Sequence, residues 1–123
     1  MPHFLPQNFQ DFVISNQVLG FFDEPITLKS GKTSQWYVNW RTVTNDAFLL
    51  DALANHIVNF LRDRLPETDT IYGVPEGASK TAVIAQMAWA KSQENFGHGS
   101  HTISLGRAKP KDHGDPKDRF FVG

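Results

Sequence analysis

Hydrophobic residues recur every three or four positions in three parts of the chain, and each part predicts a helix. The first part covers residues 8–19, and the last covers residues 78–91. The clearest stripe of apolar side chains runs through residues 48–61 and stops before a proline. Either Thr44 or Asn45 can cap this middle helix, because their side-chain oxygens accept hydrogen bonds from the free N–H groups of a first turn.

Short runs of β-branched and aromatic residues predict strands in two regions. Residues 26–28 and 36–38 are joined by a turn-forming segment that contains Gly31, which predicts a β-hairpin. Residues 70–74 and 101–105 are apolar runs on either side of the third predicted helix. A connection of that length allows parallel pairing, and such crossovers are right-handed. The alternation of strand and helix therefore predicts an α/β fold.

Composition narrows the class of protein. The chain has 123 residues, 40% of them hydrophobic and 20% charged, which is typical of one small globular domain. Its 12 Lys and Arg residues nearly balance its 13 Asp and Glu residues, so no overall field favours nucleic acid or an anionic membrane surface. The absence of cysteine excludes disulfides and thiol nucleophiles. With no signal-like start and no apolar run of about 18 residues, we expect a cytoplasmic protein.

The turn GVPEGASK, residues 73–80, is the first candidate site. Gly77 allows a ligand to approach the backbone, and the N–H groups of residues 78–80 open a helix whose positive dipole end favours an anion. The spacing is not that of a Walker A loop. The alternative is an ordinary tight turn in which Ser79 caps the helix and Glu76 complements its dipole.

The hairpin is the second candidate site. Lys29 and Lys32 stand beside three hydroxyl side chains at its tip, and such groups suit a phosphate. Trp36, Tyr37 and Asn39 follow, and an aromatic ring with a nearby amide suits a planar heterocycle. The alternative is a solvated tip above aromatic residues that serve the core.

The basic segment RAKPKDHGDPKDR, residues 107–119, is the third candidate. Its Pro and Gly residues prevent a helix, so we expect a mobile loop that could close over a polyanion and deliver a cation to developing charge. The alternative is a tail whose charges are merely solvated. The five His residues show no metal-ligand spacing, and we assign no protein metal site.

Taken in order, three segments resemble the orotate phosphoribosyltransferase family. They are ITLKSGKTSQWYVN at residues 26–39, YGVPEGA at residues 72–78 and RAKPKDHG at residues 107–114. The resemblance implies a partial type I phosphoribosyltransferase fold of the α/β class, with a helix and hairpin hood in residues 1–44. Residues 45–123 would form the first strands and helices of a parallel sheet and end in a lid loop, so that the whole is effectively one domain.

The resemblance also implies an activity. It is the transfer of phosphoribosyl from phosphoribosyl pyrophosphate to orotate, giving orotidine 5'-phosphate and diphosphate in pyrimidine biosynthesis. Mg²⁺ would be bound mainly through the pyrophosphate substrate, and the enzyme would be a homodimer. The family pattern assigns catalytic roles to Arg107, Lys111 and His113, and substrate-binding roles to Lys29, Tyr37, Val38, Asn39, Glu76, Gly77, Ala78 and Lys109.

The sequence departs from the family pattern in three places. Ala108 stands at the second basic position of the lid, although Lys109 is adjacent to it, and Glu76 with Gly77 replaces the Tyr-Lys pair of some members. The family's two acidic residues before a Thr/Gly-rich phosphate loop are absent, since the only adjacent acids are Asp23 and Glu24. We therefore expect an N-terminal portion of the enzyme that exposes apolar edges and associates. The alternative function is a non-catalytic nucleotide- or anion-binding module derived from the same fold.

Overall fold

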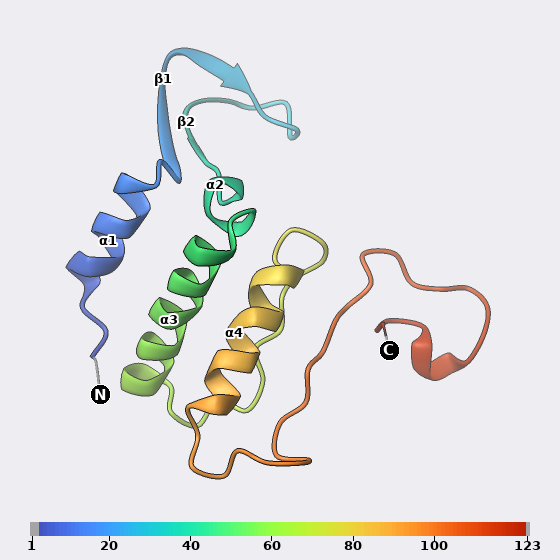
Figure 1. Ribbon diagram of the computed structural model, residues 1–123. Helices are drawn as coiled ribbons and strands as arrows, with labels where there is room; N and C mark the ends of the chain where they lie inside the picture. Colours follow the sequence, from blue (N-terminus) through green and yellow to red (C-terminus); the bar gives the residue numbers. More distant parts are fainter. Residues whose placement is uncertain (1–2, 123) are drawn as a thin grey trace.

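The computed structural model describes residues 3–122 and contains three longer helices, one β-hairpin and two short helical turns. Figure 1 shows α3 between α1 and α4, with the hairpin beyond one end of the helices and the C-terminal segment beside α4. The elements in chain order are α1 (Pro6–Ser15), β1 (Leu19–Thr27), β2 (Thr33–Val38), α2 (Arg41–Thr44), α3 (Ala47–Arg64), α4 (Ser79–Lys91) and a 3-10 helix (Pro116–Asp118).

The predicted hairpin is confirmed, with a longer first strand than the sequence indicated. β1 and β2 are antiparallel, with Phe21 opposite Trp36 and Thr27 opposite Thr33. The turn is closed by the N–H of Gly31, which donates to the carbonyl oxygen of Leu28 at 2.9 Å. Gly31 has φ of +86°, a conformation that glycine adopts without the steric cost a side chain would add. The register shifts between Phe21 and Ile26, so the hairpin is irregular in the middle of β1.

Helices form in the three predicted regions, but the first one ends at Ser15 and not at Leu19, which begins β1. The cap of α3 also differs from the expected one. Asp46 caps the helix, because its carboxylate accepts from the N–H of Leu49 at 2.8 Å. Thr44 and Asn45, the two residues favoured from the sequence, instead end the one-turn helix α2. The short helix displaces the start of α3 by one or two residues, and the next acceptor side chain along the chain takes the capping position.

The core consists of two apolar clusters along α3. In the first, Val18 and Val43 pack with Leu50 and Leu53, and side chains of α1 cover them from one side. The second joins Val58 and Leu61 to Trp89 of α4. The indole N–H of Trp89 donates to the carbonyl oxygen of Thr68 at 2.9 Å, so this buried ring keeps a polar partner. α3 is therefore the central support against which both neighbouring helices pack.

Aromatic contacts hold α1 against α3. The His56 ring of α3 lies 5.6 Å from the Phe9 ring and 4.9 Å from the Phe12 ring, measured between centroids. Burial at this position lowers the pKa of His56 below its ordinary value of 6.5. Near the C-terminal end of α3, the carboxylate of Asp63 accepts from the N–H of Phe4 at 2.7 Å. This bond is the main cause of a lowered pKa at Asp63.

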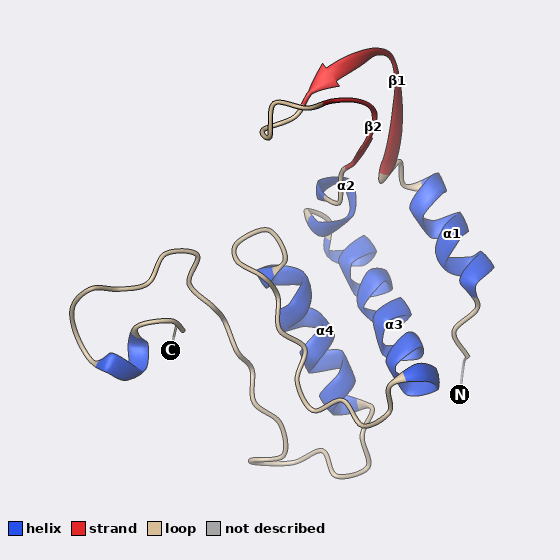
Figure 2. Ribbon diagram, turned by 180° about the vertical axis from the view of Figure 1, so that it is seen from behind, coloured by secondary structure: helices blue, strands red, loops and turns tan. Residues whose placement is uncertain are grey.

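The predicted parallel pairing of residues 70–74 with residues 101–105 is wrong. Residues 70–74 and 101–105 have no regular secondary structure, and within residues 3–122 the hairpin forms the only sheet (Figure 2). Gln86 of α4, 1% exposed, bonds to both segments instead. It accepts from the N–H of Ile71 at 3.0 Å and donates to the carbonyl oxygens of Asp69 and Thr102 at 3.2 and 2.8 Å. Two parallel strands pair weakly when no further strands extend the sheet and no helices cover both of its faces. The side chain of Gln86 therefore bonds to the three backbone groups.

The C-terminal basic segment is a closed loop. The N–H of Val122 donates to the carbonyl oxygen of Leu105, and the N–H of Arg107 donates to that of Phe120, both at 2.8 Å. Between these bonds, Gly106 and Phe121 form an isolated antiparallel bridge. The ring of Tyr72 contacts the Phe121 ring at 6.1 Å between centroids, and it lies so close to Gly106 that a β-carbon there would collide with the phenol. Tyr72 therefore connects the loop to the helical part of the molecule.

Among the described residues, no helix combines the length and the apolar character needed to cross a membrane.

Candidate functional site

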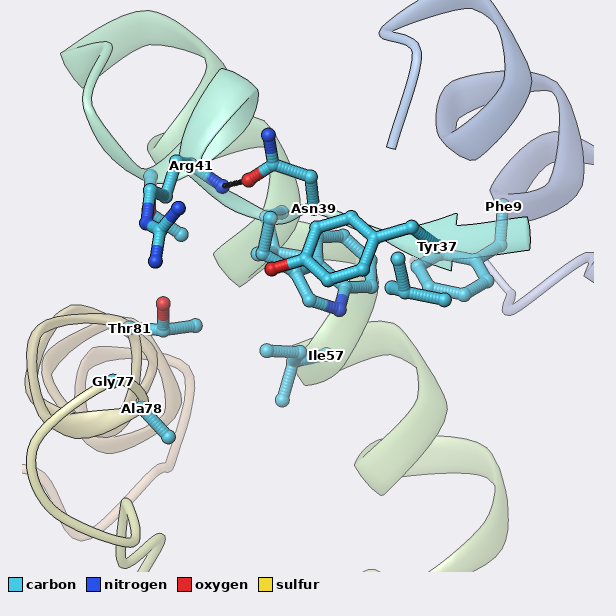
Figure 3. Close-up of a pocket in the computed structure, with 12 residues that line it drawn as sticks. Phe9, Tyr37, Asn39, Arg41, Ile57, Gly77, Ala78 and Thr81 are labelled. Carbon is cyan, nitrogen blue, oxygen red and sulfur yellow. Dashed lines mark hydrogen bonds between the residues drawn. The ribbon is translucent and has the colours of Figure 1, made fainter. Parts of the chain in front are cut away.

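A cavity of about 500 Å³ lies where the end of β2, α2, α3 and the start of α4 meet (Figure 3). This volume falls within the range of about 300–1,000 Å³ that is typical of small-molecule sites. Its lining residues are Phe9, Tyr37, Val38, Asn39, Trp40, Arg41, Thr44, Leu53, Ile57, Gly77, Ala78 and Thr81. The cavity therefore unites the hairpin with the turn before α4, two of the three candidate sites that the sequence indicated.

Most of the cavity wall is aromatic or aliphatic. The rings of Phe9 and Trp40 stack with centroids 6.3 Å apart and planes inclined by 26°. Tyr37 lies on β2, and Leu53 and Ile57 of α3 supply the aliphatic part of the wall. Flat apolar surfaces of this kind suit a planar ring, which gains dispersion and hydrophobic contact over its whole face.

The hairpin residues reach the cavity because β2 is tied to the segment that follows α1. The N–H of Asn39 donates to the carbonyl oxygen of Val18 at 2.6 Å. The side-chain oxygen of Asn39 then accepts from the N–H of Arg41 at 3.0 Å, which begins α2 (Figure 3). The predicted binding residues Tyr37, Val38 and Asn39 thus lie on one wall, and α2 starts directly beside them.

The turn before α4 supplies the opposite wall through Gly77 and Ala78, and the first turn of α4 adds Thr81. Gly73 makes this turn possible, because a β-carbon on it would collide with the carbonyl group of Ala78 and approach the Ala82 β-carbon at 2.7 Å. The N–H groups of Ala78 and Ser79, expected to be free, donate to the carbonyl oxygens of Val74 and Glu76. The alternative in which Ser79 caps the helix is wrong, since Ala78 precedes α4 and no side chain caps it.

Several of the predicted site residues lie away from the cavity. Lys29 is exposed in the hairpin turn, Glu76 is exposed in the turn before α4, and neither side chain lines the cavity. Lys111 and His113 line a separate hollow of about 250 Å³ inside the closed loop. Lys109 is exposed and lines neither space. The structure therefore joins five of the predicted residues and leaves the loop cations apart.

Within the loop, the three residues predicted to be catalytic have different surroundings. The Nε of Arg107 donates to the carbonyl oxygens of Asp118 and Phe121 at 2.8 and 3.2 Å, so this side chain helps to close the loop. The imidazole Nδ1 of His113 lies 2.9 Å from a carboxylate oxygen of its exposed neighbour Asp112. The main-chain N–H of Lys111 donates to the carbonyl oxygen of Arg119 at 2.9 Å, and its ammonium group makes no hydrogen bond or ion pair within residues 3–122.

Seven lining residues were not predicted from the sequence as cavity residues: Phe9, Trp40, Arg41, Thr44, Leu53, Ile57 and Thr81. Arg41 is the important omission, because it is the only formally charged side chain among the described residues that line the cavity. A signal was present: a single Arg follows directly on the aromatic and amide residues of YVNW. Its significance depended on the one-turn helix α2, which the sequence did not predict.

A metal site formed by the protein alone does not fit the described residues. No group of three or more His, Asp or Glu side chains between residues 3 and 122 is arranged to hold a metal ion. The polar side-chain groups of the cavity lining are one amide, two threonine hydroxyls, the phenol of Tyr37, the indole N–H of Trp40 and a guanidinium, and together they are not a strong ligand set for a divalent cation.

Comparison with known proteins gives a structural relative. No family model matches the sequence, and no curated protein matches it either. Among solved structures, the chain is similar to an orotate phosphoribosyltransferase of Francisella tularensis, with a TM-score of 0.53 and 25% sequence identity. The similarity covers 69% of this chain and 41% of that protein, so the chain spans well under half of its length. The fold is thus a partial phosphoribosyltransferase fold, as the three sequence segments implied.

Proposed function

We propose that the chain forms the base-binding part of an orotate phosphoribosyltransferase. The enzyme would transfer phosphoribosyl from phosphoribosyl pyrophosphate to a ring nitrogen of orotate, releasing diphosphate and giving orotidine 5'-phosphate. One observation carries the proposal: residues 37–39 of the hairpin and residues 77–78 of the turn before α4 line one cavity. They do so in a chain whose fold is similar to an orotate phosphoribosyltransferase.

The chemistry of the cavity supports binding of the base. Orotate is planar, and Tyr37 and Trp40 offer aromatic surface to its faces, while the amide of Asn39 offers a polar partner to its edge. On the opposite wall, the start of α4 has no side-chain cap, and the positive end of its dipole would favour the anionic leaving group. The N–H groups of Ala78 and Ser79 already donate to backbone carbonyl oxygens, so this attraction would come from the dipole and not from these two donors. The base and the diphosphate would then meet at adjacent walls of the same space.

The closed loop would contribute the cations that the reaction requires. Cleavage of the bond to diphosphate leaves a positive sugar and a highly charged leaving group, and both are stabilised by fixed charges in the transition state. Lys111 and His113 are the proposed source of such charge, and the loop would have to move toward the cavity or toward a partner subunit. Mg²⁺ would arrive with the diphosphate of the substrate. The enzyme would act as a homodimer.

The direct test is the loss of orotate absorbance after addition of phosphoribosyl pyrophosphate and Mg²⁺ to the full chain. Formation of orotidine 5'-phosphate would support the transferase. Binding of orotate or of phosphoribosyl pyrophosphate in calorimetry, with no product, would instead support the non-catalytic nucleotide- or anion-binding module. Absence of both binding and product would refute both functions.

Substitution within the loop tests the part assigned to Lys111. Lys111→Ala should lower the rate by about 100-fold while orotate binds with nearly the same affinity, because the cation acts on charge that develops in the transition state. Lys117→Ala is the matched control, since it removes the same charge from the same loop outside the proposed site. Equal rates for the two variants would show that Lys111 has no catalytic part.

A further inference from the structure

Among the described residues that line the cavity, Arg41 carries the only charged side chain, and the others are apolar or neutral. Within the described part of the chain, its side chain takes part in no hydrogen bond or ion pair, and no carboxylate lines the cavity. A cation with no counter-charge beside an apolar wall is free to pair with an anion. A ligand that fills the cavity would displace water from around the guanidinium, which lowers the local dielectric constant and strengthens that attraction.

The backbone of Arg41 is fixed even though its side chain is exposed. Its N–H donates to the Asn39 side chain at 3.0 Å, and its carbonyl oxygen accepts from the N–H of Asn45 at 3.3 Å. Val43, two residues further along α2, is fully buried in the first core cluster. Figure 3 shows the guanidinium directed across the cavity toward Thr81 of α4. The charge is therefore presented from a rigid base and into the space between the two walls.

We infer that Arg41 is a specificity-determining residue that selects a planar ring carrying a carboxylate over the same ring without one. A guanidinium presents paired N–H donors in a plane, and a carboxylate accepts both at once. The aromatic residues Tyr37 and Trp40 would hold the ring while Arg41 binds its acidic substituent. A free phosphate suits this cavity less well, because most of the wall cannot replace the water that a phosphate must lose.

This inference deepens the proposed function and rests on it for the identity of the ring. The experiment measures binding to the full chain by calorimetry with three probes: orotate, uracil and inorganic diphosphate. Uracil is the same pyrimidine without the carboxylate. The variants are Arg41→Gln and Arg41→Lys, with Arg64→Gln as a control that removes one positive charge from the end of α3, outside the cavity lining.

The wild type should bind orotate at least about tenfold more tightly than uracil, since a charge-assisted bidentate bond contributes at least that factor. Arg41→Gln should remove this preference and leave uracil affinity within about twofold, which also shows that the cavity remains folded. Arg41→Lys should fall between the two, because an ammonium keeps the charge but loses the paired geometry. Arg64→Gln should match the wild type.

Four results would overturn the inference. They are unchanged orotate affinity in Arg41→Gln, equal wild-type affinity for orotate and uracil, loss of diphosphate binding in Arg41→Gln with orotate unaffected, and no binding of any probe. The proposed transfer reaction can be refuted independently of this inference. Orotate binding that depends on Arg41 but gives no product would refute the transferase alone, whereas product formation with an unchanged KM for orotate in Arg41→Gln would refute the inference alone.

Discussion

Gly73 offers the sharpest test of how the cavity wall is built. A β-carbon at this position would lie 2.6 Å from the carbonyl carbon of Ala78 and 2.7 Å from the β-carbon of Ala82, and closer still to the Ala78 oxygen. Two of these three atoms belong to the backbone, so a side-chain rotation cannot relieve the collision. The turn and the first turn of α4 would have to move apart.

The cost of Gly73→Ala follows from this geometry. Overpacking of a well-packed site costs about 1–3 kcal/mol, and a collision with backbone places the change near the upper end, at about 2–3 kcal/mol. For a chain of this size each kcal/mol lowers the melting temperature by about 4 °C, so we expect a decrease of about 8–12 °C. Because the turn carries Gly77 and Ala78 into the cavity, orotate affinity should fall as well.

Gly77→Ala is the matched control, four residues later in the same turn. A β-carbon on Gly77 would meet no atom within 4 Å, and the backbone there does not have positive φ. This variant should be neutral or up to about 1 kcal/mol more stable, since alanine reduces the entropy of the unfolded chain. Thermal denaturation followed by circular dichroism compares the two. If Gly73→Ala melts at the same temperature as Gly77→Ala, the close approach of the turn to α4 is refuted.

Three further predictions concern the parts of the molecule that support the cavity. Because burial lowers the pKa of His56, the unfolded chain binds its proton more tightly; stability from this residue is complete above pH 6.5 and is lost as the pH falls below it. Urea midpoints at pH 8 and pH 5 should therefore differ less in His56→Leu than in the wild type, and an equal difference would contradict this. Gln86→Leu leaves one partly buried donor and two partly buried acceptors without their partner and should cost about 1–2 kcal/mol in urea denaturation, so a loss below about 0.5 kcal/mol would exclude the bonding role. Arg107→Gln should speed hydrogen exchange at the Val122 N–H while exchange within α3 stays unchanged, and equal exchange at Val122 would show that Arg107 does not close the loop.

Local patterns in the sequence were sufficient for the helices and the hairpin. The apolar stripe of α3 and the glycine turn between β1 and β2 depend on residues close together in the chain, and both predictions are confirmed. The cap of α3 was misplaced because α2, a single turn with no periodic signal, takes the residues just before it. Errors at element ends of this kind arise where two short elements compete for the same residues.

The parallel pairing could not be predicted from local pattern, because it depends on which groups meet across the fold. Residues 70–74 are β-prone, yet the N–H of Ile71 donates to the Gln86 side chain of α4 and not to a neighbouring strand. A polar residue at 86 shares a helix face with Ala82, Ala85 and Trp89, all buried, and that position is the signal that a buried amide would need a partner. Which backbone groups it would reach is a property of the tertiary structure alone.

The candidate site also combines residues that local sequence pattern identifies with a residue whose role depends on the tertiary structure. The residues that line the cavity from the hairpin and the turn before α4 were identified from their types and order, whereas Arg41 depended on the placement of α2. The roles proposed for Lys29, Glu76 and Lys109 remain predictions, because their exposed side chains lie outside the cavity. Their contribution would require a ligand large enough to extend beyond the cavity, as phosphoribosyl pyrophosphate is.

The closure of the C-terminal loop has a consequence for how this molecule could be redesigned. Residues 105–107 and 120–122 pair with each other, so the chain leaves and rejoins the rest of the structure at adjacent positions. Residues 108–119 supply no buried side chain to either core cluster. The loop is therefore an exchangeable module: its length and charge can be varied, or a short turn can replace it, while the packing of the helices stays the same.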